Sequence, residues 1–334
     1  MKNIKIVMAS DDKYAQHLGV LIVSILYNST DEESFTFYIL DGGISEQNRL
    51  KIERVKKIKE FHIEYLTVDW SLLASCPDMR YYSKNTFSRL LIPEMLPHES
   101  RVIYLDVDII VKSSLSEFWD ADMQGRSIGC IEDSGDSSYQ KNILGLEDTF
   151  YFNAGVLLIN LDRIRQYNLF QKTLMWIDKY NYLLIFPDQD ALNVVFHNDK
   201  IKLESKWNYR PSEKNSNPYS IIHYSCESKP WSYMYTGYLQ EEYLFYQNLS
   251  PWKDVSPSDK NIKNRIRKLM MPLMNLKNWL ADFIAHRMIK HSKWLQNTLS
   301  EHQQLYDACI KYKKMLYQRD SNNSNDNPPK ISVD

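Results

Sequence analysis

Two carboxylates follow a continuous apolar run near residue 105. Asp106 and Asp108 come directly after Val102-Ile-Tyr-Leu105, a pattern that predicts a strand buried on both faces of a largely parallel sheet. Charges are tolerated where such a strand leaves the sheet, and ligands of open α/β sheets bind at that carboxyl edge. On an extended chain, residues i and i+2 project to the same side, about 6 to 7 Å apart at Cα. The pair therefore predicts a clamp for one divalent cation, with Val107 between its ligands.

The tripeptide alone is weak evidence, because an Asp-x-Asp sequence in a loop is more often turn chemistry or solvated surface. Two later residues suit the same chemistry. His223 ends a short strand pattern and could complete a metal site that already holds two aspartates, and Lys229, followed by Pro230, suits a phosphate. A lone histidine is otherwise usually a satisfied core or surface residue.

Polar residues also stand beside two other apolar runs. Asn153, Ala154 and Gly155 precede a strand predicted from residue 156 to about 161, where a ligand could approach the backbone closely. An ordinary turn before a core strand explains them equally well. Pro187-Asp-Gln-Asp190 heads an apolar helix, and acids in a first helical turn are commonly only a complement to the helix dipole.

Strands and helices alternate in the elements that must position these residues. Hydrophobic periodicity predicts strands over 4–9, 35–40 and 61–68, with helices over 18–26 and 45–58 between them. This βαβαβ order favours a doubly wound α/β sheet. Neither a Gly-x-Gly-x-x-Gly after the first strand nor a P-loop is present, so a bound nucleotide diphosphate needs another counter-charge. The Asp106/Asp108 clamp with a metal would provide it.

Length and composition exclude several classes of protein. With 334 residues, 43% of them hydrophobic, the chain can bury a full core in one large or two modest domains. The net charge of −1 argues against a nucleic-acid-binding protein. The four cysteines are widely spaced without Cys-x-x-Cys, which favours a reducing compartment. Since neither a signal-peptide pattern nor a membrane-spanning apolar run is present, we expect a cytoplasmic protein, soluble or peripherally attached.

The composition shifts toward the C-terminus. Nine basic residues lie between 260 and 293 against one acid, Asp282, with aliphatic and aromatic residues between them at helical spacing. This pattern favours a helix on an anionic membrane surface. The alternative is a helix packed on the preceding domain, and Pro272 would kink either one. We therefore predict a catalytic domain over 1–250, a basic amphipathic helical extension over 251–318 and a disordered tail over 319–334.

Taken in order, the segments between residues 4 and 245 resemble glycosyltransferase family 8, which includes lipopolysaccharide galactosyl- and glucosyltransferases and glycogenin. Tyr104-Leu-Asp-Val-Asp108 is similar to the family's Asp-x-Asp motif, and Ala9-Ser-Asp-Asp-Lys-Tyr14 is similar to its opening motif. The resemblance implies a GT-A type fold with a mixed, nucleotide-binding, doubly wound sheet. It also implies a retaining enzyme.

The resemblance assigns roles to individual residues. It implies that Asp11 and Tyr14, with Ala9 and Asp12 beside them, bind the uridine end of a UDP-sugar. It places Arg89 of Thr86-Phe-Ser-Arg89, and Asn153 and Ala154, at the donor sugar. It makes Asp106, Asp108 and His223 the metal ligands, with Val107 between them and Lys229 at the diphosphate. Two departures stand out: Lys13, where close relatives often have asparagine, and Cys226, where the family usually has glycine and a Cβ could crowd the diphosphate.

The expected reaction moves galactose or glucose from UDP-galactose or UDP-glucose to a saccharide or lipid-linked acceptor. Mn²⁺, which suits a mixed O/N site, or Mg²⁺ would stabilise the leaving diphosphate together with Lys229. Asp188, Gln189 and Asp190 form the catalytic motif on the acceptor side. Gln189 is a neutral amide and a poor nucleophile, so we favour same-face attack by the acceptor over a covalent intermediate.

Two other classes of protein could use the same residues. A metal-dependent UDP-sugar hydrolase or nucleotidyltransferase would use the same clamp with a water or triphosphate site. A non-catalytic scaffold is disfavoured because Asp106, Asp108, His223 and Lys229 are all present.

Overall fold

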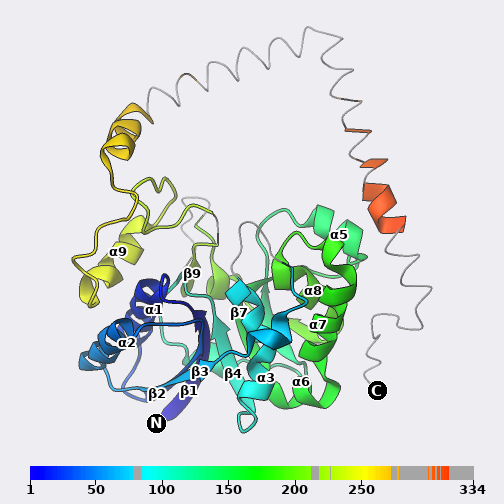
Figure 1. Ribbon diagram of the computed structural model, residues 1–334. Coiled ribbons are helices and arrows are strands. Elements are labelled where there is room, and N and C mark those ends of the chain that lie inside the picture. The colour runs from blue at the N-terminus through cyan, green and yellow to red at the C-terminus, as the bar shows by residue number, and fades with distance from the viewer. Residues whose placement is uncertain are drawn as a thin grey trace.

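The computed structural model describes residues 1–77, 84–211, 218–225 and 227–271, with positions 277, 300, 303–304, 307–308 and 310–315. In this part of the chain, a seven-stranded sheet has the order β3-β2-β1-β4-β7-β6-β8, and β5 pairs with β9 in a second sheet (Figure 1). The strands are β1 (Lys2–Ser10), β2 (Glu33–Asp41), β3 (His62–Thr67), β4 (Arg101–Leu105), β5 (Ile109–Val111), β6 (Ile128–Glu132), β7 (Phe152–Asn160), β8 (Lys200–Lys202) and β9 (Ile221–His223).

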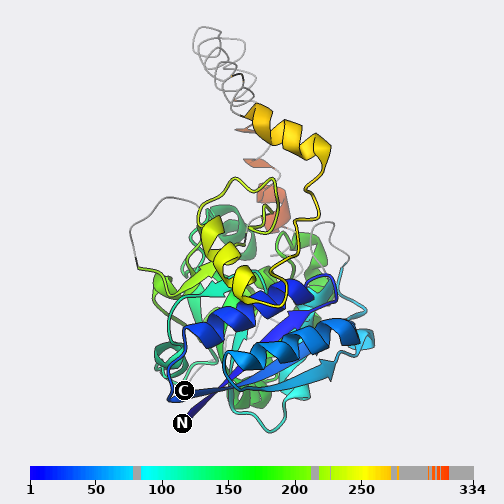
Figure 2. The same ribbon diagram turned by 90° about the vertical axis from the view of Figure 1, so that its left-hand side faces the viewer.

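Helices cover both faces of the main sheet. Helices α1 and α2 lie over one face, which is turned toward the viewer in Figure 2, and α6, α7 and α8 lie over the other (Figure 1). The α-helices are α1 (Ala15–Tyr27), α2 (Glu46–Glu53), α3 (Ile92–Met95), α4 (Ser116–Trp119), α5 (Ser138–Leu144), α6 (Leu161–Tyr167), α7 (Leu169–Tyr180), α8 (Pro187–Val195) and α9 (Gln240–Leu249). The 3₁₀ helices are η1 (Arg54–Lys57), η2 (Trp70–Leu73), η3 (Lys84–Leu91), η4 (Asn181–Leu183) and η5 (Ser205–Asn208).

Strand directions confirm the predicted doubly wound, mixed sheet. Strands β1 to β4 are parallel, whereas β7 runs antiparallel to its neighbours β4 and β6. The chain proceeds from β1 through β2 to β3 in one direction and then returns to place β4 on the other side of β1. Ligands of open sheets bind beyond the carboxyl ends of the strands at such a reversal. Asp11 follows β1 and Asp106 follows β4, so both lie there.

Strand β4 contributes to two hydrophobic cores. Val102 and Tyr104 pack into the core beneath η3, α6, α7 and α8, while Ile103 and Leu105 pack into the core that includes α1 and α9. All four are at most 1% exposed, which confirms the predicted burial on both faces. Alternate side chains of a strand point to opposite faces, so both cores hold β4 in place and define where its carboxyl end emerges.

Two local predictions were wrong. The Asp106–Asp108 segment is not extended, because the chain bends there between β4 and β5, which belong to different sheets. Asn153, Ala154 and Gly155 lie inside β7 rather than before it. The β6–β7 register shifts at this place, since Cys130 pairs with Leu157 but the next residue, Ile131, pairs with Asn153. Such irregularities re-aim side chains next to functional sites.

The C-terminal extension is described only in part. Residues 262–271 and 310–315 are helical, and Lys314 Nζ lies 2.5 Å from Glu147 Oε1 beyond α5. Pro272, Cys226 and the tail 319–334 lie outside the described residues. The predicted domain division at residue 250 and the predicted disorder of the tail stay predictions. Among the helices that are described, none has the length and apolarity needed to cross a bilayer.

Candidate active site

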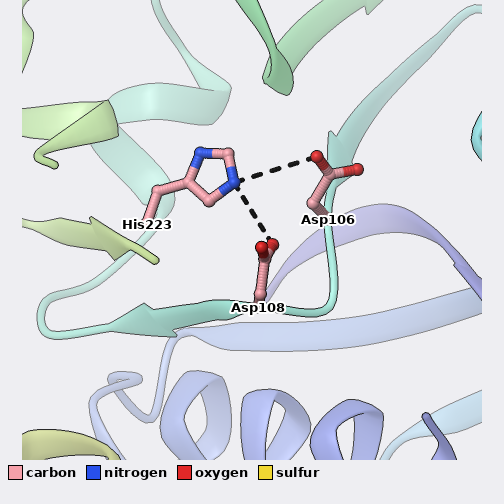
Figure 3. Close-up of side chains that lie close together, drawn as sticks. All are labelled: Asp106, Asp108 and His223. Carbon is pink, nitrogen blue, oxygen red and sulfur yellow. Dashed lines mark ion pairs between the residues drawn. The ribbon is translucent and has the colours of Figure 1, made fainter. Parts of the chain in front are cut away.

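Three side chains predicted as metal ligands converge where the two sheets meet. Asp106 follows β4, Asp108 precedes β5, and the pairing of Ile109 with His223 brings β9 to the same place. One potential ligand atom from each side chain lies within 4.8 Å of the other two. Figure 3 shows His223 Nε2 pointing between the carboxylates, 3.2 Å from Asp108 Oδ1 and 3.8 Å from Asp106 Oδ2.

The donor set fits a divalent cation. Carboxylate oxygens suit Mg²⁺ and Mn²⁺, and an imidazole nitrogen moves the preference toward Mn²⁺ and its neighbours. The side chain of His223 is 3% exposed, whereas that of Asp106 is 28% exposed, so the cluster is closed at the histidine and open at one carboxylate. A phosphate could approach a bound cation from that open side.

Lys229 reaches the same cluster. Its Nζ lies 2.7 Å from Asp108 Oδ2 and donates to the Tyr224 carbonyl at 2.8 Å. Burial would raise the pKa of Asp108, but the positive charge of Lys229 beside it acts in the opposite direction, and that pKa is held well below its usual range. Asp108 therefore stays ionised, and Lys229 provides a fixed positive charge next to the cluster.

Arg89 connects two parts of the site instead of projecting freely toward a ligand. It lies on η3, with a side chain only 4% exposed. Its Nη2 is 3.0 Å from Asp106 Oδ1, and its Nε is 2.9 Å from Asp188 Oδ2. The guanidinium also lies 4.3 Å from the centre of the Tyr104 ring. Burial raises the pKa of Asp188 to about 6, although Arg89 acts in the opposite direction.

The predicted catalytic motif forms the first turn of α8, which begins with Pro187 as expected for a helix start. Asp190 is fully buried, and its Oδ2 accepts the N–H groups of Ile185 and Phe186 at 2.7 and 2.8 Å. Its other oxygen accepts the hydroxyl of Tyr151. One oxygen of Asp190 thus binds the backbone just before α8, and the other binds Tyr151, the residue before β7.

Gln189 faces the irregular part of β7. Its Oε1 accepts Asn153 Nδ2 at 3.0 Å and the Ala154 N–H at 3.1 Å. Its Nε2 lies 3.3 Å from the Tyr151 hydroxyl and 3.4 Å from Asp133 Oδ2. These contacts bring the Asn153 segment and α8 together, and they occupy the amide oxygen of Gln189.

The residues predicted to bind uridine lie at the carboxyl end of β1. Ala9 pairs with Leu40 of β2, and Asp11 Oδ1 accepts the Tyr14 N–H at 3.0 Å. Asp12 Oδ1 accepts the Ser45 N–H and Asn48 Nδ2, both at 2.8 Å, and so joins this turn to the start of α2. Those hydrogen bonds give Asp12 a structural role in addition to its predicted place in the donor site. Val107 packs, partly buried, against the core on the α1 side.

Sequence reasoning missed four residues in or beside the site: His17, Asp133, Tyr151 and Asn208. Asp133 directly follows β6, and an acid just beyond a buried strand was a usable signal. His17 was a polar residue within an apolar helical run. The other two carry no local signal, because their roles depend on residues distant in sequence.

His17 holds the segment that carries Lys229. Its ring stacks on Trp231 with centroids 3.6 Å apart, and its Nδ1 lies 2.7 Å from the Tyr243 hydroxyl. The side chain is 8% exposed, and burial lowers the pKa of His17 to about 3. Helix α1 thus supports Lys229 through an uncharged histidine.

The free energy of unfolding should therefore depend on pH through His17. Its folded pKa lies below the unfolded value of 6.5, so its contribution is complete above pH 6.5 and is lost as the pH falls toward 3. We expect a loss of about 2 to 3 kcal/mol between pH 6.5 and about 4.5. Urea unfolding at both pH values should show a smaller loss for His17→Phe, which retains a ring against Trp231. Equal losses in the two proteins would contradict the assignment.

Known proteins share both the fold and the sequence pattern. A family model described as glycosyl transferase family 8 matches residues 5–235. A putative glycosyltransferase of Haemophilus influenzae is 31% identical over 69% of this chain and 73% of its own length. The lipopolysaccharide 1,2-glucosyltransferase of Escherichia coli K12 is 24% identical over 82% of this chain and 86% of its own length.

Solved structures agree with these sequence matches. The galactosyltransferase LgtC, in a crystal structure with donor and acceptor sugar analogues, superimposes with a TM-score of 0.68 and 29% identity. The match covers 77% of this chain and 98% of LgtC. The mixed sheet and the acidic cluster thus define a glycosyltransferase of the GT-A fold. The protein belongs to glycosyl transferase family 8.

Proposed function

We propose that this glycosyltransferase moves galactose or glucose from a UDP-sugar to a saccharide acceptor and keeps the anomeric configuration. The observation that carries the proposal is the convergence of Asp106, Asp108 and His223 with Lys229, beside Asp188 and Gln189. One side of this arrangement suits a metal-bound diphosphate. The other side presents carboxylate and amide groups that suit sugar hydroxyls.

The relatives support a role in cell-surface glycan synthesis. The E. coli relative is a lipopolysaccharide glucosyltransferase, and a Salmonella typhimurium relative is a lipopolysaccharide galactosyltransferase. LgtC is a galactosyltransferase that has been crystallised with donor and acceptor sugar analogues. We infer a lipopolysaccharide-like or other lipid-linked saccharide acceptor. Because these relatives include both glucosyl- and galactosyltransferases, either UDP-glucose or UDP-galactose remains a donor to test.

Charged side chains of the protein would stabilise the departing UDP. Departure of UDP places negative charge on the diphosphate, next to which Lys229 provides a fixed ammonium group. Asp106, Asp108 and His223 would hold Mn²⁺ or Mg²⁺ there. The bound metal would supply Lewis-acid stabilisation of the diphosphate. Arg89 keeps Asp106 and Asp188 in fixed positions. The proposed metal ligand and the proposed sugar-binding carboxylate therefore do not need to reorganise during the reaction.

Same-face attack by the acceptor suits the residues near the sugar. Gln189 is neutral, and its oxygen already accepts two hydrogen bonds. Asp190 is saturated by Tyr151 and two backbone N–H groups, so we assign it a positioning role within the catalytic motif. Asp188 is buried and paired with Arg89. None of these three is a free nucleophile, and a trapped glycosyl adduct on any of them would overturn this mechanism.

Donor turnover tests the proposed activity directly. UDP release from UDP-galactose and UDP-glucose would be measured with Mn²⁺, Mg²⁺ or EDTA, in the presence and absence of a saccharide acceptor. Metal-dependent, acceptor-stimulated release from one donor is the expected result. Full-rate release of free sugar without acceptor would instead indicate the hydrolase alternative. If no uridine diphosphate binds with any metal, the proposed function is wrong.

The helix over residues 262–271 is our proposed contact with the cytoplasmic face of a membrane. Ile262, Ile266 and Leu269 are 77%, 58% and 79% exposed, with exposed Lys263, Arg265 and Arg267 between them. Aliphatic and basic side chains together suit an anionic bilayer surface. Lys268 Nζ donates to the Tyr233 carbonyl and so attaches this helix near the Lys229 segment. The exposed aliphatic and basic side chains of this helix support the proposal that the protein is peripheral on the inner face of the membrane.

Vesicle sedimentation should detect that membrane contact. We expect the full chain to sediment with phosphatidylglycerol vesicles but not with phosphatidylcholine vesicles. Ile266→Asp with Leu269→Asp should weaken binding at least about tenfold, because two aliphatic side chains lose their burial in lipid. Leu50→Asp on α2, which replaces a side chain that is also exposed, is the matched control. Binding unaffected by the double substitution would exclude this helix as the contact.

A further inference from the structure

A chain of side-chain amides connects the metal cluster to the first turn of α8. Asn208 ends η5, and its Oδ1 lies 2.9 Å from His223 Nδ1. Its Nδ2 donates to Asn153 Oδ1 at 2.9 Å, and Asn153 Nδ2 donates to Gln189 Oε1 at 3.0 Å. Two asparagines thus form a continuous path from a predicted metal ligand to the predicted catalytic amide.

Backbone N–H groups determine the direction of every bond in this path. The Gly155 N–H donates to Asn153 Oδ1 at 3.1 Å, so that atom must be the amide oxygen. The Asn208 atom facing it is therefore the NH₂ group, which leaves the Asn208 oxygen toward His223. An amide oxygen only accepts, so His223 Nδ1 carries the hydrogen.

This tautomer prepares His223 to bind a cation. With a hydrogen on Nδ1, Nε2 is the ring nitrogen whose lone pair is left for a cation, and it faces Asp108 Oδ1 at 3.2 Å and Asp106 Oδ2 at 3.8 Å. A lone pair opposite two carboxylates is favourable only with a positive charge between them. Groups that fix the tautomer and orientation of a ligating histidine typically contribute about 10- to 100-fold to metal affinity.

We propose that Asn208 is a positioning residue with two separable roles. Its oxygen presents His223 Nε2 to the divalent cation, and its NH₂ group holds Asn153, and through it Gln189, in the orientation needed for sugar transfer. The inference rests on the proposed function, because both the cation and the part played by Gln189 belong to it. Asn208 couples the donor-diphosphate end of the site to the sugar end.

Two substitutions separate the roles. Asn208→Asp retains an oxygen acceptor for His223 Nδ1 but has no N–H for Asn153. Asn208→Leu has a similar size and removes both hydrogen bonds. Mn²⁺ affinity would be measured by electron paramagnetic resonance titration of the full chain without donor. We expect Asn208→Asp to bind Mn²⁺ within about threefold of the native protein and Asn208→Leu about 10- to 100-fold more weakly.

The rate of transfer reports the second role. At saturating Mn²⁺ and donor, we expect kcat to fall at least about tenfold in both variants, since neither can donate to Asn153. Asn198→Leu, which replaces an exposed asparagine, controls for a general effect of such substitutions. Circular dichroism would verify folding, and Asn208→Ala would replace Asn208→Leu if that variant does not fold.

Each role has its own contradicting result. Native Mn²⁺ affinity in Asn208→Leu would overturn the role toward His223. Native kcat in Asn208→Asp would overturn the role toward Asn153 and Gln189. Failure of the proposed function would look different, because the native protein itself would then neither bind Mn²⁺ nor turn over a UDP-sugar.

Discussion

Replacement of Asp108 by asparagine is expected to reduce kcat for transfer from a UDP-sugar by about 10³-fold, because it removes both a metal ligand and a charge. The amide would retain the shape of the side chain but would offer a much weaker ligand to Mn²⁺. The native carboxylate also lies 2.7 Å from Lys229 Nζ and 3.2 Å from His223 Nε2. The substitution therefore disturbs the cation site and the fixed ammonium group together.

Steady-state kinetics with graded Mn²⁺ would measure this effect. The substitution should raise the Mn²⁺ concentration needed for half-maximal rate and leave a low residual kcat at saturation. Asp31→Asn, which replaces an exposed carboxylate and changes the net charge equally, should behave like the native protein. If Asp108→Asn retains native kcat and metal dependence, the metal centre must lie elsewhere.

Gly155→Ala is expected to abolish tight Mn²⁺ binding and to lower kcat by about 10²- to 10³-fold, through shape alone. A Cβ at this position would lie 2.3 Å from His223 Cε1 and 2.5 Å from Asp106 Oδ2. Atoms cannot remain so close, so the added methyl group must displace one or both predicted ligands. Both are held by further bonds, His223 to Asn208 and Asp106 to Arg89, and these bonds resist a small adjustment.

A loss of stability must be separated from this loss of metal binding. Gly125→Ala is the matched control, because Gly125 has a φ of +70° and no neighbouring atom within 4 Å of an added Cβ. That control should lower the melting temperature while retaining native Mn²⁺ affinity. Mn²⁺ titration and thermal unfolding of both variants would provide the comparison. Native metal affinity in Gly155→Ala would show that the cluster does not bind the ion as we propose.

Strand and helix order was predictable because it depends on short-range pattern. The apolar run of β4 is buried on both faces as expected, and Pro187 begins α8 as expected. The Asp106, Asp108, His223 and Lys229 set could also be predicted, because its motifs resemble those of a known family in type and order. The helix predicted over residues 45–58 instead ends at Glu53 and continues as the 3₁₀ helix η1 to Lys57.

The amino-acid sequence by itself determined the βαβ alternation, the fold class and which carboxylates stand at a strand's carboxyl end, since side-chain periodicity and residue type are local properties. Only the tertiary structure decided how those groups meet. The bend at Asp106–Asp108, the shifted register of β7, the placement of Arg89 between two carboxylates and the Asn208 link all depend on pairings between distant segments. Such pairings are set by the packing of both cores around the sheet, which no short stretch of sequence contains.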